Sequence, residues 1–304
     1  MARRKKGREV NGWLIVDKPR GVTSTQVVGR ARWAFDAQKA GHAGTLDPLA
    51  SGLLAVAFGE ATKTVPFAQE GLKTYQFTAR WGQATTTDDQ EGEICAEADL
   101  RPTADQIEAI LAQFTGDIMQ TPPVFSAIKV DGARAYDLAR KGEEVALAAR
   151  PIWIESLKLI SQPDADHAIF EMVCGKGGYV RSMARDIGDA LGCFAHVADL
   201  RRLSSGGFDL NGSMGFEALE ALKGDETRDT HLMPVESGLS GIQEVSVNEL
   251  TAELLSNGRA DAAPQSDANL YWAGFNGHVI AVIEKNELMQ HQLLRVFHGW
   301  RPVS

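Results

Sequence analysis

The stretch Gly41–Leu54 gathers side chains that can do chemistry into one short loop. It contains the carboxylate of Asp47 and the imidazole of His42, and it leads directly into the apolar segment Leu53–Phe58. A carboxylate can act as a covalent nucleophile, and glycines let the backbone approach a ligand closely. Pro48 fixes the backbone just after the aspartate. Taken alone, however, an Asp-Pro pair after glycine is also typical of an ordinary turn.

A second candidate site lies at Gly175–Gly178, which reads Gly-Lys-Gly-Gly. Successive backbone N–H groups in such a turn can bind an anion, although a plain tight turn is an equally good interpretation. Arg181 follows in the first turn of a predicted helix, where the helix dipole disfavours a cation. This placement indicates a partner anion for Arg181, with a solvated arginine as the alternative. Tyr179 beside it can also be a simple packing residue.

The sequence lacks the motifs of nucleotide and metal cofactors. It contains neither G-x-x-x-x-G-K-[ST] nor a G-x-G-x-x-G segment after a predicted strand. The seven histidines are scattered, and none has metal-ligand spacing to a cysteine or to another histidine. We therefore predict no cofactor and no metal.

Hydrophobic periodicity predicts helices and strands in irregular alternation. Capping boxes at Thr23 with Gln26 and at Thr103 with Gln106 mark the starts of two helices, the second ending at Gly116. The other predicted helices are Ala135–Lys141 and Tyr179–Leu191, and the predicted strands are Gly12–Lys18, Leu53–Phe58, Lys73–Gly82, Ile152–Ile160, Ala168–Cys174 and Phe194–Ser204. Adjacent strand pairs indicate an α+β fold with a mixed, largely antiparallel sheet and flanking helices.

We expect three parts along the chain. Residues 1–9 form a basic flexible arm. Residues 10–240 form the main domain, with a short helix near its end at Phe216–Leu222. Residues 241–304 form a small, mainly β domain of short strands, including Val279–Glu284 and Leu293–Phe297.

The net charge of −9 is unevenly distributed along the chain. Residues 209–304 contain 14 acidic and 6 basic residues, whereas residues 1–208 contain 26 and 25. Six acidic residues between Asp88 and Asp99 form a cluster that we expect to be a solvated loop. Since a phosphate-binding face needs only local positive charge, the acidic total does not exclude RNA as a partner.

Cysteine usage and hydropathy indicate the compartment. The three cysteines have no C-x-x-C spacing, which is typical of reduced thiols. No apolar region follows the basic N-terminus, and the longest clean apolar run, Leu53–Phe58, is far shorter than a membrane span. We predict a cytoplasmic monomer without a membrane segment.

Four blocks within about residues 10–208 carry a family resemblance in their order and spacing. The blocks are Asn11–Pro19 with Gly21–Ser24; Gly41–Leu54 continuing into Phe58–Lys63; Gln120–Lys129 with Gly132 and Arg134–Tyr136; and Cys174–Ser182 reaching Leu200–Arg202. Together they resemble the TruB family of bacterial tRNA pseudouridine-55 synthases. The resemblance implies the sheet core of the pseudouridine synthases, and a C-terminal RNA-binding domain of the PUA type or a divergent version of it.

The resemblance also implies roles for single residues. The catalytic aspartate of the family falls on Asp47, and Arg181 matches the arginine that pairs with it. Tyr75 matches the tyrosine that stacks on the target uracil. The residues that match the T-loop wedge and the lining of the base pocket are His42, Tyr179 and Leu200. The basic residues expected to bind RNA are Lys18, Lys176, Arg201 and Arg202, of which Lys18 lies in a block that supports the catalytic loop.

The implied reaction converts uridine 55 in the T loop of tRNA to pseudouridine. The N1–C1′ bond breaks, the base turns and C5 joins C1′, with no net redox change, so the chemistry requires neither cofactor nor metal. Flipping the base out costs a few kcal/mol, and one stacking aromatic returns about 1–3 kcal/mol. The T arm is expected to be recognised by its shape and phosphates. The sequence leaves open whether Asp47 attacks C1′, attacks C6 or assists elimination to a glycal.

Three other functions are compatible with parts of the sequence. One is a guide-RNA-dependent relative from a ribonucleoprotein particle, which the short C-terminal region and the absence of long basic tails disfavour. Another is a tRNA-folding chaperone, which the presence of Asp47 disfavours as a sole function. The last is an unrelated α+β enzyme that shares turn motifs by chance, which the presence of four blocks in the same order disfavours.

Overall fold

The computed structural model describes residues 7–126, 129–130, 133–134 and 147–300. The chain forms two compact units. The first unit contains residues 1–48, 52–71 and 205–304, and the second contains residues 49–51 and 72–204. The domain boundary at residue 240 therefore stays a prediction from the sequence. The predicted helix Ala135–Lys141 lies outside the described residues.

The first unit begins with strand β1 (Gly12–Lys18), which has the predicted bounds. Strand β1 pairs antiparallel with β3 (Ser51–Phe58) and parallel with β14 (Met214–Gly215). The short strand β2 (Ala40–His42) pairs antiparallel with β3. The segment between β2 and β3 is the loop that contains Asp47.

Helix α1 (Ser24–Ala34) connects β1 to β2 and begins where its sequence predicts. Thr23 and Gln26 form both halves of the predicted capping box. Such a box satisfies backbone N–H groups that would otherwise lack partners at a helix start. The position of α1 matters for the site because Ser24, its first residue, contacts the Asp47 loop.

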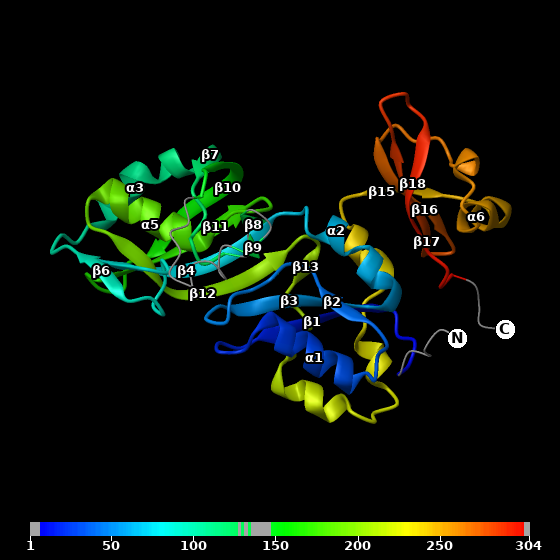
Figure 1. The fold of residues 1–304 in the computed structure, drawn as a ribbon, viewed down its shortest axis with the longest axis horizontal. Coiled ribbons are helices and arrows are strands. Elements are labelled where there is room, and N and C mark those ends of the chain that lie inside the picture. Colours follow the sequence, from blue (N-terminus) through cyan, green and yellow to red (C-terminus); the bar gives the residue numbers. More distant parts are fainter. Residues whose placement is uncertain (1–6, 127–128, 131–132, 135–146, 301–304) are drawn as a thin grey trace. The chain divides into compact units, whose positions relative to one another are not determined.

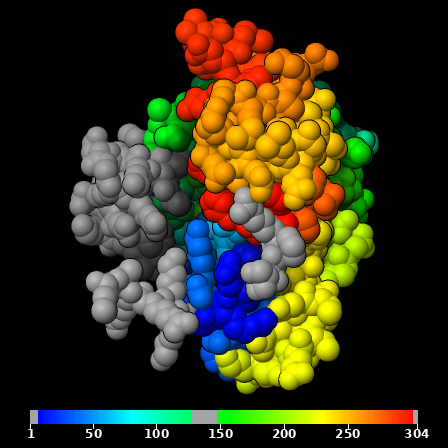
Figure 2. All heavy atoms as spheres, turned by 90° about the vertical axis from the view of Figure 1, so that its right-hand side faces the viewer, coloured from blue at the N-terminus to red at the C-terminus, as the bar shows by residue number. Residues whose placement is uncertain are grey.

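The basic arm predicted over residues 1–9 does not extend to Arg8. The N–H of Arg8 donates to the carbonyl of Asp36 at 2.6 Å, and its guanidinium pairs with Asp229 at 2.6 Å. Figure 2 shows the first described residues, in dark blue, beside the yellow segment that contains Asp229. The prediction of a flexible arm is therefore wrong for Arg8.

The C-terminal part of the first unit has a sheet of its own, as the sequence predicts. Its strand order is β15-β16-β17-β18, with helix α6 (Glu249–Ser256) packed on β16 and β17. The strands are Gln243–Ser246, Leu270–Phe275, His278–Lys285 and His291–Val296. Buried residues of α6 and the two central strands, including Leu255, Tyr271 and Ile283, form its core.

The second unit is built on a sheet with the order β12-β4-β11-β10-β7. Strand β11 pairs antiparallel with β4 and with β10, and β10 pairs antiparallel with β7. The strands are Lys73–Trp81 (β4), Gly116–Gln120 (β7), Arg150–Ser161 (β10), His167–Cys174 (β11) and Ala195–Ser205 (β12). This confirms the predicted α+β class with a mixed, largely antiparallel sheet.

Two helices lie on one face of this sheet, α3 (Ala104–Leu111) and α5 (Val180–Leu191) (Figure 1). Helix α3 starts at the predicted capping box but ends at Leu111, before the predicted stop. A short 3-10 turn follows, and Gly116, at a φ of 82°, begins strand β7 instead.

The remaining elements are short. The strands are β5 (Gln83–Thr85), β6 (Ile94–Glu97), β8 (Lys129–Val130), β9 (Ala133–Arg134) and β13 (Phe208–Asp209). The helical turns are α2 (Val65–Ala68) and the 3-10 segments Gly59–Lys63, Ala112–Phe114, Glu217–Leu222, Arg228–His231, Val235–Leu239 and Ala260–Ala262. Within the described ranges, no helix has both the length and the apolar character that crossing a bilayer requires.

All three cysteines are free thiols, as their spacing predicts. Cys95 is exposed, whereas Cys174 and Cys193 are buried. Burial raises the pKa of Cys174 to about 12 and that of Cys193 to about 11. The two buried thiols therefore stay protonated at neutral pH.

Candidate functional site

The loop that contains Asp47 is held rigidly on both sides of the aspartate. The hydroxyl of Ser24 donates to the carbonyl of Leu46 and accepts from the N–H of Leu46, both at 2.9 Å. On the other side, the carbonyl of Pro48 accepts from the N–H of Gly21 at 2.7 Å. Asp47 itself is half-buried. A carboxylate fixed in this way can be presented to a substrate without first ordering its own loop.

Lys18 supports the same loop from the end of β1. Its side chain is fully buried, and its ammonium donates to the carbonyls of Pro19, Val22 and Pro48 at 2.9, 2.7 and 3.2 Å. A buried ammonium is tolerated only when hydrogen bonds replace its water. The predicted RNA contact is therefore wrong for Lys18, whereas its predicted support of the loop agrees with these contacts.

His42 is the last residue of β2 and lies opposite Val56 of β3. It is half-buried, and four residues separate it from Asp47. The first unit thus brings together three of the residues singled out in the sequence, namely Lys18, His42 and Asp47, around one loop.

In the second unit, Tyr75 lies on strand β4, in the same alternating set of positions as Phe77 and Trp81. Those two side chains are buried, whereas Tyr75 is half-buried. Because side chains of a strand alternate between faces, Tyr75 continues the buried face up to the surface. A half-buried aromatic at that position can offer its ring as a stacking surface.

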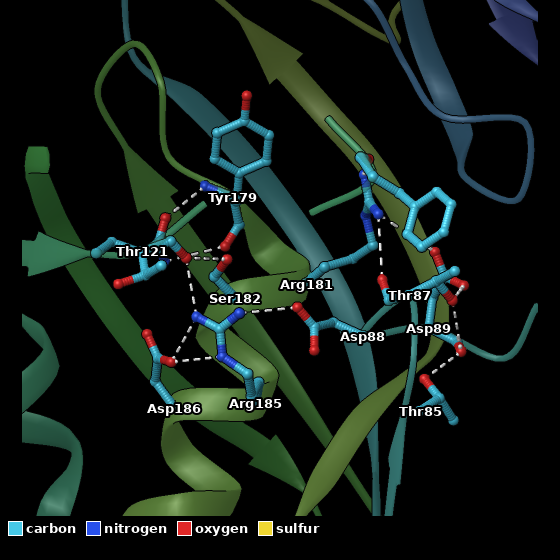
Figure 3. Close-up of polar contacts among 12 residues, drawn as sticks. Thr85, Thr87, Asp88, Asp89, Thr121, Tyr179, Arg181, Ser182, Arg185 and Asp186 are labelled. Carbon is cyan, nitrogen blue, oxygen red and sulfur yellow. Dashed lines mark hydrogen bonds and ion pairs between the residues drawn. The ribbon is translucent and has the colours of Figure 1, made fainter. Parts of the chain in front are cut away.

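The start of α5 is clamped to the end of β7. Tyr179 is the N-cap residue of α5, and the side-chain amide of Gln120 meets its backbone twice. The Gln120 amide donates to the Tyr179 carbonyl at 3.1 Å and accepts from the Tyr179 N–H at 2.9 Å. The ring of Tyr179 points away from the polar network below it (Figure 3). Gln120 opens the third block of the family resemblance, but no role was predicted for its side chain.

Arg181 is nearly buried, with 8% of its side chain exposed. Its guanidinium donates to the carbonyl of Thr87 at 3.2 Å and to that of Phe125 at 3.0 Å. The carboxylate of Asp89, itself 11% exposed, lies 3.7 Å away. Arg181 is therefore not a solvated arginine, and the anion that its helix position predicts is present in Asp89.

The acidic residues Asp88 and Asp89 do not belong to a solvated loop, and the prediction is wrong for both. Asp88 pairs with Arg185 at 2.8 Å, and its pKa is raised because burial outweighs the charges of Arg185 and Arg181. The carboxylate of Asp89 accepts a hydrogen bond from the hydroxyl of Thr87. The run Thr85–Thr87 before the acids could have indicated a folded polar loop, because threonine hydroxyls readily bond nearby backbone and carboxylate oxygens.

A buried histidine lies behind this loop. His196 of β12 is 3% exposed, and its Nδ1 lies 3.0 Å from the carbonyl of Gln83. Burial lowers its pKa from the ordinary 6.5, partly opposed by the Gln83 contact and by Asp89, while Arg80 lowers it further. The folded protein therefore favours a neutral imidazole at this position.

The other predicted site residues of the second unit differ in exposure. Lys176 is exposed and Arg201 is half-buried, so both can reach a phosphate. Arg202 is only 1% exposed, and the predicted RNA contact is wrong for it because its side chain lacks accessible surface. Leu200 is buried, with 8% exposed, and its carbonyl lies 3.5 Å from the hydroxyl of Ser51.

A cavity of about 400 Å³ in the first unit contains none of the predicted site residues. Three of its four carboxylates already have partners: Glu60 pairs with Lys63, Asp229 with Arg8, and Glu236 accepts from the N–H of Val279. No group of three or more potential metal ligands occurs in the part of the chain that the structure describes. Neither observation therefore indicates a better candidate site than the Asp47 loop.

Comparisons with known sequences identify relatives over most of the chain. Residues 32–180 match the model of the TruB family pseudouridylate synthase N-terminal domain, and residues 181–240 match the tRNA pseudouridylate synthase B C-terminal domain. The tRNA pseudouridine synthase B of Dinoroseobacter shibae is 56% identical over 93% of this chain and 94% of its own length. That of Caulobacter vibrioides is 54% identical over 86% and 84%.

Solved structures with the same fold are more distant in sequence. A Cbf5-Nop10-Gar1 complex contains a chain with a TM-score of 0.73 and 23% identity, covering 94% of this chain and 85% of that one. An H/ACA RNP bound to a substrate RNA containing 2′-deoxyuridine gives a TM-score of 0.72 at 20% identity, covering 99% and 93%. These two matches establish the fold alone.

Proposed function

The chain belongs to the TruB family of pseudouridylate synthases and isomerises uridine in tRNA, and on this premise we propose that its target is uridine 55 of the T loop. Asp47 is the catalytic carboxylate in this proposal. The observation that supports it best is the clamped loop, in which the backbone is fixed at both Leu46 and Pro48. Fixed placement of a nucleophile can remove several kcal/mol from a barrier, about 7–11 kcal/mol in the best intramolecular cases.

Arg181, a nearly buried guanidinium, is the second catalytic residue in this proposal, as the family resemblance implies. An arginine is suited to this role because its planar fork can serve several acceptors at once. The carbonyls of Thr87 and Phe125 already orient the guanidinium. Tyr75 stacks on the flipped uracil, which offsets part of the cost of unstacking the base, a few kcal/mol.

The remaining candidates contact the base or the RNA backbone. Tyr179 and Leu200 line the base pocket, and His42 wedges into the space that the base leaves. Lys176 and Arg201 contact phosphates of the T arm. Recognition then rests on the folded shape of the arm, as is usual for structured RNA.

The proposed reaction is balanced without an external reactant. The N1–C1′ bond breaks, the uracil turns, and C5 bonds to C1′. The hydrogen at C5 leaves as a proton, and N1 gains a proton in exchange. Asp47 acts either at C1′, at C6 or by assisting glycal formation, and all three routes release the C5 hydrogen to water.

The proposed substrate is tRNA alone, without a guide RNA. The relatives named tRNA pseudouridine synthase B match this chain over almost their whole length, which supports that choice. Because tRNA is matured where it is transcribed in bacteria, we place the enzyme in the cytoplasm.

Tritium release from an unmodified tRNA transcript labelled at C5 of its uridines tests the proposal. We expect wild type to release one equivalent per tRNA, and Asp47→Asn to be slower by at least about 1,000-fold, as when a covalent catalyst is removed. Asp105→Asn, which changes an exposed aspartate of α3, serves as the matched control and should act like wild type. Equal release by Asp47→Asn would refute the site, and release from a transcript with cytidine at position 55 would refute the position.

A further inference from the structure

Arg185 lies one helical turn after Arg181 on α5, on the same face of the helix. Its guanidinium donates to the Asp88 carboxylate at 2.8 Å and to the carbonyl of Thr121 at 2.8 Å. Its Nε donates to Asp186 at 2.9 Å. All three edges of the guanidinium are thus engaged, which is the geometry that only arginine can supply.

The two arginines bridge the same two segments. Arg181 joins Thr87 to Phe125, and Arg185 joins the next residue, Asp88, to Thr121, four residues before Phe125. Figure 3 shows the two side chains on successive turns of α5, with Asp88 and Thr87 on neighbouring parts of one loop. The Arg185 bridge therefore acts in parallel with the Arg181 contacts.

Several contacts make the Arg185 bridge stiff. The carbonyl of Thr121 also accepts from the hydroxyl of Ser182 at 2.8 Å. Asp88 has a left-handed backbone, with a φ of 59°, and its carbonyl accepts from the N–H of Val197 at 3.0 Å. A non-glycine residue in that conformation persists only where its surroundings enforce it.

Charge favours the bridge as well. Burial disfavours the charged form of Arg185, but Asp88 and Asp186 outweigh it and raise the pKa of the guanidinium. The pKa values of both carboxyls are raised by burial, which Arg185 opposes. Arg185 therefore favours the ionised form of both acids, against the burial that disfavours it.

We propose that Arg185 is a positioning residue for Arg181. By joining Asp88 to Thr121, it sets the separation of the two segments whose carbonyls, at Thr87 and Phe125, orient the Arg181 guanidinium. The idea rests on the proposed function, since it assumes that Arg181 assists the reaction. Arg185 itself needs no contact with RNA.

The decisive variant is Arg185→Lys, which keeps the charge but cannot reach Asp88, Asp186 and Thr121 together. We expect the single-turnover rate constant of tritium release, at saturating enzyme, to fall about 10–100-fold, as displacements of about 1 Å near an active site do. The dissociation constant for tRNA, measured by filter binding, should stay within about twofold of wild type. If Arg185 had a merely structural role, the variant would lower the fraction of enzyme that is folded and reacts. It would not lower the rate constant of the folded enzyme.

Two further variants sharpen the test. Arg101→Lys breaks another arginine–carboxylate pair of the same unit, with Asp166, and should leave both the rate constant and the tRNA affinity unchanged. Asp88→Asn should lower the rate constant in the same direction as Arg185→Lys. The double variant should be no slower than the slower single variant, because both changes disable one bridge.

The outcomes separate this inference from the proposed function. If wild type releases no tritium, the proposed function fails. If wild type reacts and Arg185→Lys retains its rate constant, the positioning role is refuted, as it is if the rate constant falls only in proportion to tRNA affinity. If Arg185→Lys does not fold, Asp88→Asn decides by the same two measurements.

Discussion

Replacing Lys18 by methionine tests whether the N-terminal block holds the catalytic loop. Methionine keeps most of the length and apolar volume of the stem but removes the ammonium, whose three carbonyl acceptors lie at 2.7–3.2 Å. Each hydrogen bond from a charged donor contributes about 1.5–3 kcal/mol. The desolvation of one buried ion, several kcal/mol, offsets part of that sum. We expect a net loss of about 2–4 kcal/mol in the free energy of unfolding.

The assay is thermal unfolding followed by the single-turnover rate of tritium release at a temperature where the variant is folded. The predicted loss of stability corresponds to a melting temperature lower by about 3–6 °C. The rate should also fall, because one of the three acceptors is the carbonyl of Pro48, next to Asp47. Lys158→Met, at an exposed position of β10, is the control. A Lys18→Met variant with the wild-type melting temperature and rate would refute the reasoning.

Two other predictions concern groups whose pKa burial shifts. Since the pKa of His196 is lowered from 6.5, the unfolded chain takes up its proton first, and stability falls as pH drops below 6.5. His196→Gln should flatten this slope, by at most about 1.4 kcal/mol per pH unit, in urea titrations between pH 8 and pH 5. At pH 8 a thiol reagent should label Cys95 alone in the folded protein and all three cysteines in denaturant, because burial protects the others. Fast labelling of a second thiol without denaturant would contradict this.

Local sequence signals were enough to predict most of the fold. Strand β1 has the predicted bounds, and both capping boxes start helices where expected. These signals work because turns, caps and alternating apolar residues depend on near neighbours in sequence. Strand β7 was missed because its five residues have little apolar periodicity, and their strand conformation depends on pairing with β10.

The site was harder to predict where partners are distant in sequence. A count of charges at Asp88 and Asp89 could not reveal arginines more than 90 residues away. Nor could it show that Arg202 is buried, since a basic residue after a strand is as compatible with a surface as with a core. Tertiary burial decides the role of these charged side chains. A buried charge requires a partner within the protein, so it contributes to the structure and not to an RNA contact.

The same reasoning explains why the N-terminal block and the glycine-rich loop occur together in this sequence. Ser24 and Lys18 have no evident chemistry of their own, yet each bonds to a neighbour of Asp47. Ser24 bonds to Leu46, and Lys18 bonds to Pro48. A carboxylate in a loop of half-exposed residues would otherwise sample many positions, and ordering it at each turnover would cost about 1–2 kcal/mol per residue. Because strand β1 and the first turn of α1 hold the loop, it is ordered once, when the protein folds, and not at each turnover. The rigidity of the loop is therefore a property of residues 12–48 as a whole, and changes at Lys18 or Ser24 should lower the rate even though neither side chain takes part in the proposed chemistry.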